Sequence, residues 1–180
     1  SEIAQMDQAA EDLQRGLIAE HQRQDNVARP DLETSVKLLP TGAAYYALGN
    51  IASRQRNLDS AKQYYAAAAG SEGEIGQAAG LALMRLDLPQ NPGKYIRTQA
   101  GLDSRGMLVV AIANPTTVPV TGLAVAVQYV DAEGRTRDFR RNYNGTLAAG
   151  QQVQIATGLG PFQNAEQYRV ALTSARIVEQ

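Results

Sequence analysis

The chain has 180 residues, of which 44% are hydrophobic and 19% are charged, a composition typical of globular domains. Its formal net charge of -1 argues against a nucleic-acid or anionic-membrane partner, since both require a concentrated basic surface. The absence of cysteine excludes disulfides and thiolate metal sites, and no run of 18 apolar residues is present that would insert directly into a membrane.

Two helices are predicted in the first 40 residues. Apolar side chains recur at steps of three or four residues between Glu2 and Gln24, and again from Pro30 to Leu39. Pro30 suits the first turn of the second helix. We interpret this pair as a degenerate repeat unit that precedes a clearer one. Because the chain lacks an initiator methionine, we expect either a processed protein or a fragment, and its start within a helical pattern favours a fragment.

The stretch from Tyr45 to Ala68 predicts two helices joined by a tight turn. Small residues at Gly49 and Ala61 allow the helices to approach closely, and Asp59 is the expected N-cap of the second helix. A further helix is expected from Glu74 to Leu86, as the start of a third unit. The packing faces of the hairpin are expected to consist of Tyr45, Leu48, Gly49 and Ala52 in the first helix and Ala61, Tyr65 and Ala68 in the second.

A domain boundary is predicted at Leu88 to Gly93, where two prolines and a glycine end helices and the hydrophobic period changes to two. We therefore expect a helical domain over residues 1–88, a linker over 89–93 and a β domain over 94–180. The predicted strands are Tyr95–Leu102, Met107–Ala113, Leu123–Asp131, Thr136–Tyr143, Val153–Thr157 and Tyr168–Val178.

The hairpin pattern resembles a tetratricopeptide repeat, with Ala52 and Arg56 in place of the usual aromatic residue and glycine. The strand spacing resembles an immunoglobulin-like sandwich. The two together resemble the non-catalytic C-terminal region of bacterial zinc metalloproteases related to the CAAX-prenyl protease family. The resemblance implies an α+β chain with segregated domains, and a periplasmic or otherwise exported location, without excluding the cytoplasm.

Residues able to carry catalysis are scarce. His21 is the single histidine, and the sequence lacks both a His-Glu-x-x-His motif and a Gly-x-Ser-x-Gly elbow. The arginines between Arg135 and Arg141 alternate faces of a strand, which favours a solvated edge strand over an anion site. The sequence therefore predicts no catalytic residue, no metal site, no cofactor and no enzymatic activity.

A peptide-binding surface is predicted on the concave side of the clearer hairpin. Tyr46, Asn50 and Arg54 follow one another at steps of four residues, and Tyr64 is able to join them. These side chains offer stacking and hydrogen bonds to an extended peptide. The alternative is that a neighbouring helix or the β domain covers this face.

The function predicted from the sequence is a non-catalytic interaction module that binds a protein or peptide, as an accessory region of a larger exported bacterial protein such as a zinc metalloprotease. One alternative is a small-ligand binder or enzyme with its site at the domain junction. Another is a purely structural assembly subunit. Partner identity, oligomeric state and domain orientation are not specified by the sequence.

Overall fold

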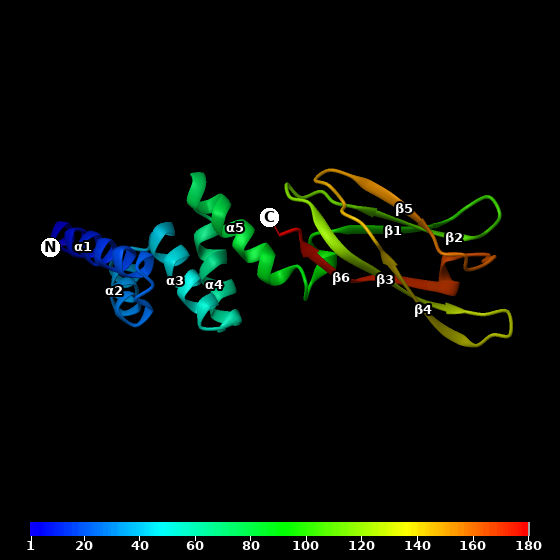
Figure 1. Cartoon of the computed structure of the whole chain (residues 1–180), viewed down its shortest axis with the longest axis horizontal. Coiled ribbons are helices and arrows are strands. Elements are labelled where there is room, and N and C mark those ends of the chain that lie inside the picture. The colour runs from blue at the N-terminus through cyan, green and yellow to red at the C-terminus, as the bar shows by residue number, and fades with distance from the viewer. Residues whose placement is uncertain (180) are drawn as a thin grey trace. The chain divides into compact units, whose positions relative to one another are not determined.

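The computed structural model describes residues 1–179, and the chain divides into two compact units, Ser1–Leu86 and Asp87–Gln180. Helices occupy the first unit and strands the second, as the colours of Figure 1 show along the chain. The prediction of a helical block followed by a β block is confirmed, and the fold class is α+β. Gln180, which ends the predicted second domain, lies outside the described residues. No helix among the described residues is long and apolar enough to cross a membrane.

The helical unit has short turns between its helices. The N-caps of α1, α3 and α4 are Ser1, Thr41 and Asn57, whose side chains each accept a hydrogen bond from the backbone N–H three residues on. Asn57 therefore replaces the predicted cap Asp59, because it directly precedes the first helical residue. The helices are α1 (Glu2–His21), α2 (Asp25–Leu38), α3 (Gly42–Arg54), α4 (Leu58–Ala69) and α5 (Gly73–Asp87).

Helix α2 starts five residues earlier than predicted, at Asp25, so that Pro30 lies inside the helix. Proline lacks an N–H and removes one helical hydrogen bond. Pro30 is the sixth residue of α2 and lies beyond the first turn, so the hydrogen bond that an N–H at this position would donate to the Asn26 carbonyl is missing. Packing offsets it, since Ala28, Leu32 and Ser35 are all buried on the inner face of α2.

The first four helices form two hairpins that repeat the same contacts at a spacing of 33 residues. Gly16 lies against Leu32 in the first hairpin, and Gly49 lies against Tyr65 in the second. A Cβ atom at either glycine would come within 2.6 Å of its partner's side chain. The close approach predicted at Gly49 is thus present, and an equivalent approach occurs one repeat earlier.

The turns of the two hairpins are equivalent as well. Arg23 and Arg56 both adopt φ of 61°, in the left-handed region that ends many helices. In each turn the following N–H donates to the carbonyl five residues back, at 2.8 Å after Arg23 and 2.9 Å after Arg56. The non-glycine residues at these two positions store a modest conformational strain that the packed hairpins hold in place.

Two apolar clusters hold the helical unit together. The first joins α1, α2 and α3, and the second joins α3 and α4 to partly buried residues of α5. Both contain α3, so this helix is shared between the hairpins. The buried members are Ala19, Ala28, Leu32, Ala44, Ala47, Leu48 and Ile51 in the first cluster, and Ala52, Ala61 and Tyr65 in the second.

The β unit contains two three-stranded antiparallel sheets, ordered β1-β2-β5 and β4-β3-β6. Both sheets bury alternate residues on one face, and Figure 1 shows them as two layers. The buried members include Leu108, Val110 and Ile112 of one sheet and Leu123, Val125 and Val127 of the other. The strands are β1 (Arg97–Leu102), β2 (Leu108–Ala113), β3 (Val120–Val130), β4 (Thr136–Tyr143), β5 (Gln152–Ala156) and β6 (Tyr168–Ile177).

The predicted immunoglobulin-like sandwich is corrected by this topology. An immunoglobulin fold divides at least seven strands into sheets of four and three. The described residues form three strands in each sheet, and strand β3 pairs with both β4 and β6. The alternating pattern predicted the strands, but it carried no information on which strands pair.

A buried amide ties two loops of the β unit together. The Asn114 side chain is 1% exposed, and its Nδ2 donates to the carbonyls of Val118, Leu147 and Ala148 at 2.8, 3.1 and 3.3 Å. Its Oδ1 accepts from the backbone N–H and the hydroxyl of Thr116 at 3.0 and 2.6 Å. Three carbonyl neighbours fix which end of the amide carries the nitrogen.

Arg141 joins the two sheets at one edge. Its Nη1 on β4 donates to the Ala156 carbonyl on β5 at 2.8 Å, and its guanidinium lies 5.4 Å from the Phe139 ring centroid. Both β4 and β5 are edge strands. A charged side chain across adjacent edges hinders the addition of a foreign strand there.

The β unit begins with a polar cluster around Asp87. Its carboxylate accepts from Asn91 Nδ2 at 2.7 Å and from the Tyr95 hydroxyl at 2.8 Å, and Lys94 Nζ lies 3.4 Å away. Burial, together with the hydrogen bond to Asp87, raises the pKa of Tyr95 to about 12. Side-chain hydrogen bonds to Asp87 thus stabilise the segment in which two prolines and a glycine mark the end of the helical pattern.

Candidate functional site

The structure places Arg54, one of the four predicted binding residues, in an internal ion-pair network. Its Nε and Nη2 contact the two carboxylate oxygens of Asp25 at 3.0 and 2.6 Å, and Nη2 lies 3.0 Å from Glu20 Oε1. This paired geometry is the strong form of the arginine–carboxylate contact. Arg54 therefore fastens α3 to the turn between α1 and α2.

The other predicted residues make two separate sets of contacts in the second hairpin. Tyr65 donates its hydroxyl to Asn50 Oδ1 at 2.7 Å, and the Tyr46 and Tyr65 ring centroids are 5.8 Å apart. Burial raises the pKa of Tyr65. Tyr64 lies instead against Tyr45, at 6.4 Å between centroids. Tyr65 thus brings Tyr46 and Asn50 together, whereas the Tyr64 ring contacts Tyr45, and the peptide-binding role of the four residues stays a prediction.

Acidification is expected to release the contact between Asp25 and Arg54. The hydrogen bond from Arg54 holds the pKa of Asp25 below its ordinary 3.8. The contact therefore contributes fully above that unfolded-state value, and its contribution is lost as pH falls through the lower folded-state pKa. Urea unfolding should find Asp25→Asn about 1 kcal/mol less stable than the wild type at pH 7. The difference should shrink at acidic pH, and a difference independent of pH would contradict this assignment.

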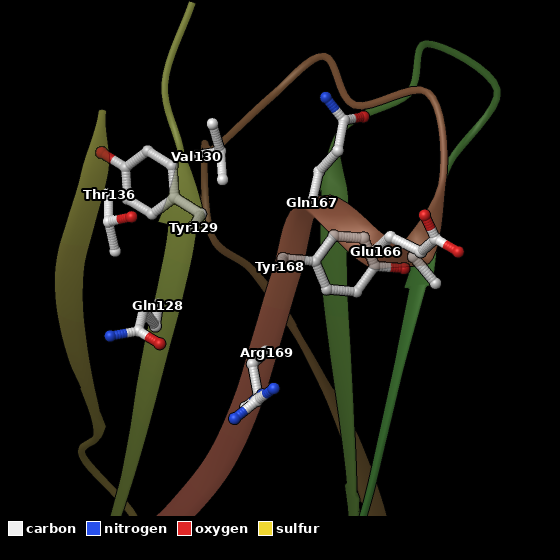
Figure 2. Close-up of a pocket in the computed structure, with 9 residues that line it drawn as sticks. Gln128, Tyr129, Val130, Thr136, Glu166, Gln167, Tyr168 and Arg169 are labelled. Atoms are coloured by element: carbon white, nitrogen blue, oxygen red, sulfur yellow. The ribbon is translucent and has the colours of Figure 1, made fainter. Parts of the chain in front are cut away.

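A cleft lies in the β unit where strands β3 and β6 part. Tyr129 and Tyr168 form the last pair of the two strands, while β3 continues to pair with β4 through Val130 and Thr136. Figure 2 shows β3 and β6 diverging beyond this tyrosine pair. The space between them has a volume of about 380 Å³. It is lined by Gln128, Tyr129, Val130 and Thr136 on one side and by Ala165, Glu166, Gln167, Tyr168 and Arg169 on the other.

The cleft walls carry polar side chains that are not paired with other side chains of the described residues. Gln128, Thr136, Glu166 and Arg169 are exposed, and no side-chain hydrogen bond or ion pair engages them among the described residues. In Figure 2 the Arg169 and Gln128 side chains lie on neighbouring strands near the lower end of the cleft. One cation, one carboxylate, an amide and a hydroxyl are therefore available to a ligand.

An aromatic cluster supports the cleft from within. The Phe162 ring is buried, and its centroid lies 6.0 Å from that of Tyr129 and 5.4 Å from that of Tyr168. The Phe162 N–H donates to the Gly106 carbonyl at 2.8 Å, which fixes the loop between β5 and β6. Rings held in this way keep the two tyrosines in place without a ligand.

Two further elements order the end of the sheet. Gln167 Oε1 accepts from the backbone N–H groups of Gln163 and Asn164 at 2.6 and 3.2 Å. Asp131 accepts backbone hydrogen bonds in the β3–β4 turn, first from Arg135, and a side-chain bond from Arg137. These bonds lower its pKa. Hydrogen bonds therefore fix the turns that adjoin the cleft on both sides.

A second depression adjoins the cleft. It has a volume of about 430 Å³ and shares Tyr129, Val130 and Gln167 with the first. The loop residues Gly158–Phe162 and the turn residues Asp131 and Ala132 complete its lining. The two depressions thus lie against the same three residues.

The sequence predicted none of the cleft residues as functional. Gln128 and Arg169 are paired neighbours in the sheet but lie 41 positions apart in the chain. The sequence feature that could have indicated the cleft is a pair of tyrosines: Tyr129 lies near the end of one predicted strand, and Tyr168 lies at the start of another. Pairing those strands requires the sheet order, which alternation does not provide. The described residues contain no group of three or more histidine, cysteine, aspartate and glutamate side chains able to hold a metal.

Comparison with known proteins gave little likeness. No protein-family model and no curated protein matches the chain. A solved structure that resembles it in part is the Pseudomonas fluorescens alkylpurine DNA glycosylase AlkC bound to DNA containing an abasic site analog. The match covers 84% of this chain and 51% of that chain, with 11% identity and a TM-score of 0.27. The chain thus spans about half the length of that protein.

These findings correct several expectations from the sequence. The likeness to a metalloprotease-associated region is not found, and a solved structure that does resemble the chain in part is a DNA-bound enzyme. The predictions of a non-catalytic protein-interaction module, of no enzymatic activity and of no nucleic-acid partner are withdrawn. A TM-score of 0.27 is too low to argue what this chain binds or catalyses, so the glycosylase activity is not transferred either.

The prediction that no nucleic acid binds relied on the net charge of the whole chain, which averages two units of different charge. Residues 1–86 contain eight basic and eleven acidic side chains, whereas residues 87–180 contain nine basic and seven acidic ones. The net charge of the whole chain conceals this difference and does not exclude an anionic partner of the β unit. The exported location predicted from the sequence stays a prediction.

Proposed function

We propose that the β unit binds a saccharide in the cleft between β3 and β6. The observation that carries the proposal is the mixture of free polar groups at the cleft walls: the Arg169 guanidinium, the Glu166 carboxylate, the Gln128 amide and the Thr136 hydroxyl. A sugar hydroxyl both donates and accepts hydrogen bonds. A sugar therefore suits a cleft that offers hydrogen-bond donors, hydrogen-bond acceptors and groups, such as a hydroxyl, that both donate and accept.

Other ligand classes fit the cleft less well. A site for a polyanion concentrates cations, yet Glu166 stands on the same wall as Arg169. A site for an apolar ligand is lined mainly by apolar and aromatic side chains. Here the main apolar contribution comes from the exposed side chain of Val130 and the rings of the two tyrosines. These three suit the C–H face of a sugar ring, while the polar groups suit its hydroxyls.

The adjoining depression supports a ligand longer than one sugar. Because both depressions share Tyr129, Val130 and Gln167, a chain of two or more sugars is able to occupy them together. The β unit would then recognise an oligosaccharide.

The 33-residue equivalence of the helical hairpins further supports a helical-repeat architecture for the first unit.

Calorimetric titration of the full chain with glucose and N-acetylglucosamine oligomers, and with an acidic oligosaccharide, tests the proposal. Replacing Gln128 or Glu166 with alanine should each weaken binding about fivefold, as expected for the loss of about 1 kcal/mol of hydrogen bonding. Asn142→Ala is the matched control, because Asn142 is exposed on the adjacent strand outside the cleft. Failure of every oligosaccharide to bind, or equal weakening by the control, would refute a saccharide site here.

A further inference from the structure

The chain contains one asparagine followed by a glycine, the pair Asn144 and Gly145, directly after strand β4. Both residues are exposed, and neither belongs to a helix or a strand. Because glycine has no side chain, no β-carbon shields its backbone nitrogen from the side chain of the preceding residue. The pair is therefore the place in this sequence where an asparagine side chain most easily reacts with its own backbone.

Both groups that would react at this turn lack hydrogen-bond partners. Among the residues that the structure describes, neither the Asn144 amide nor the Gly145 N–H makes a hydrogen bond. Gly145 is held instead through its carbonyl, which accepts from the Thr121 hydroxyl at 3.1 Å. The Asn144 side chain is therefore free to rotate towards the Gly145 nitrogen.

The other asparagines each lack at least one of these features. Asn91 and Asn114 precede prolines, whose nitrogen carries no proton, and Asn114 is also buried. Asn142 lies within β4 and precedes a tyrosine. Asn164 uses its Oδ1 to accept from a backbone N–H at 3.0 Å. The three asparagines of the helical unit lie in helices or at an N-cap.

We propose that Asn144 is a site of spontaneous deamidation. After the Gly145 N–H loses its proton to hydroxide, the nitrogen attacks the Asn144 Cγ and a new N–Cγ bond forms. The Cγ–Nδ2 bond breaks, and the amide nitrogen takes a proton from water and leaves as ammonia. Water then opens the cyclic imide at either of its two carbonyl carbons, which yields aspartate or isoaspartate. The net reaction consumes one water and releases one ammonia.

The modification changes the charge of one surface of the β unit. Asn144 and the exposed Arg176 line the same depression, which has a volume of about 320 Å³. Arg176 is the one charged side chain in the described lining, and it makes no ion pair among the described residues. This depression shares no lining residue with the saccharide cleft. Deamidation therefore adds a carboxylate beside this arginine and leaves the cleft residues unchanged.

Incubation of the full chain at mildly alkaline pH, followed by tryptic digestion and mass spectrometry, tests this inference. Trypsin cleaves after Arg141 and after Arg169, and the peptide between them contains the site and two control asparagines, Asn142 and Asn164. Each conversion raises the mass by about one dalton, and fragmentation locates it. Conversion at Asn144 should be at least about tenfold faster than at either control. A sample digested without incubation corrects for conversion during the digestion.

Two variants test the route through the backbone nitrogen. Asn144→Gln lengthens the side chain, so that the ring is harder to close. Gly145→Ala adds a Cβ that would lie 3.3 Å from the partly exposed Tyr143 ring. Each variant should slow conversion at position 144 about tenfold. Circular dichroism checks that both variants keep the fold.

Three outcomes would overturn the assignment. The first is conversion at Asn142 or Asn164 as fast as at Asn144. The second is an unchanged rate in Gly145→Ala, which would exclude attack by the backbone nitrogen. The third is an Asn144 that stays intact in the chain but converts in a synthetic peptide of residues 142–148, since the fold would then keep the two groups apart.

Discussion

Replacing Asn114 with leucine is expected to lower the free energy of unfolding of the β unit by about 4 kcal/mol. The change removes the donor to three carbonyl groups and the acceptor for Thr116, in a place that is almost fully buried. A buried polar group left without a partner costs about 1 to 3 kcal/mol, and several are stranded here. A loss of this size is a large share of the stability of an ordinary domain.

Asn114→Asp should be at least as damaging at pH 7, because it places a carboxylate among those carbonyl oxygens. Part of the loss should be recovered at acidic pH, where the protonated acid regains one donor. Urea denaturation followed by the NMR signals of the β unit measures both variants. Asn142→Asp, on an exposed strand position, serves as the control and should change stability by less than about 0.5 kcal/mol. A loss below about 1 kcal/mol for Asn114→Leu would show that the loops do not depend on this amide.

Alanine at Gly49 is expected to destabilise the helical unit by up to about 2 kcal/mol, although alanine favours helices. The new Cβ would lie 2.6 Å from the Tyr65 ring, which is buried and hydrogen-bonded to Asn50. Overpacking of this kind costs about 1 to 3 kcal/mol and exceeds the helix-propensity gain of about 1 kcal/mol.

The same substitution at Gly80 is the matched control for Gly49. Gly80 lies inside α5, and no atom stands within 4 Å of its added Cβ. Gly80→Ala should therefore stabilise the chain by about 0.5 to 1 kcal/mol. Thermal and urea unfolding of the two variants should show shifts of opposite sign. Shifts of the same sign would mean that the contact between the hairpin helices is looser than the structure indicates.

Local patterns in the sequence were enough to predict the second hairpin and the strands. Gly49 and Tyr65 lie on faces whose spacing is visible in the sequence, and the strands follow from alternation and turn residues. The helix start at Asp25 was missed because Pro30 is a strong local signal, whereas the burial that overrides it depends on α1. Local patterns thus predicted elements, and tertiary contacts decided some of their ends.

Contacts between distant residues were the part that the sequence did not predict. Arg54 was expected to face a ligand, but its partner Asp25 lies 29 positions earlier. The cleft depends on Tyr129 and Tyr168 meeting across strands that do not follow one another in the chain. Neither pairing has a local signature. The candidate site was therefore accessible only once the sheet order was known.

The matching turns at Arg23 and Arg56 have a consequence for how the helical unit unfolds. Since the contacts of one hairpin recur 33 positions later, its stability is close to a sum of two similar terms and the interface that α3 provides between them. Such an array behaves as a one-dimensional chain of coupled segments. Damage to one hairpin is then transmitted to the other only as far as that shared interface is weakened.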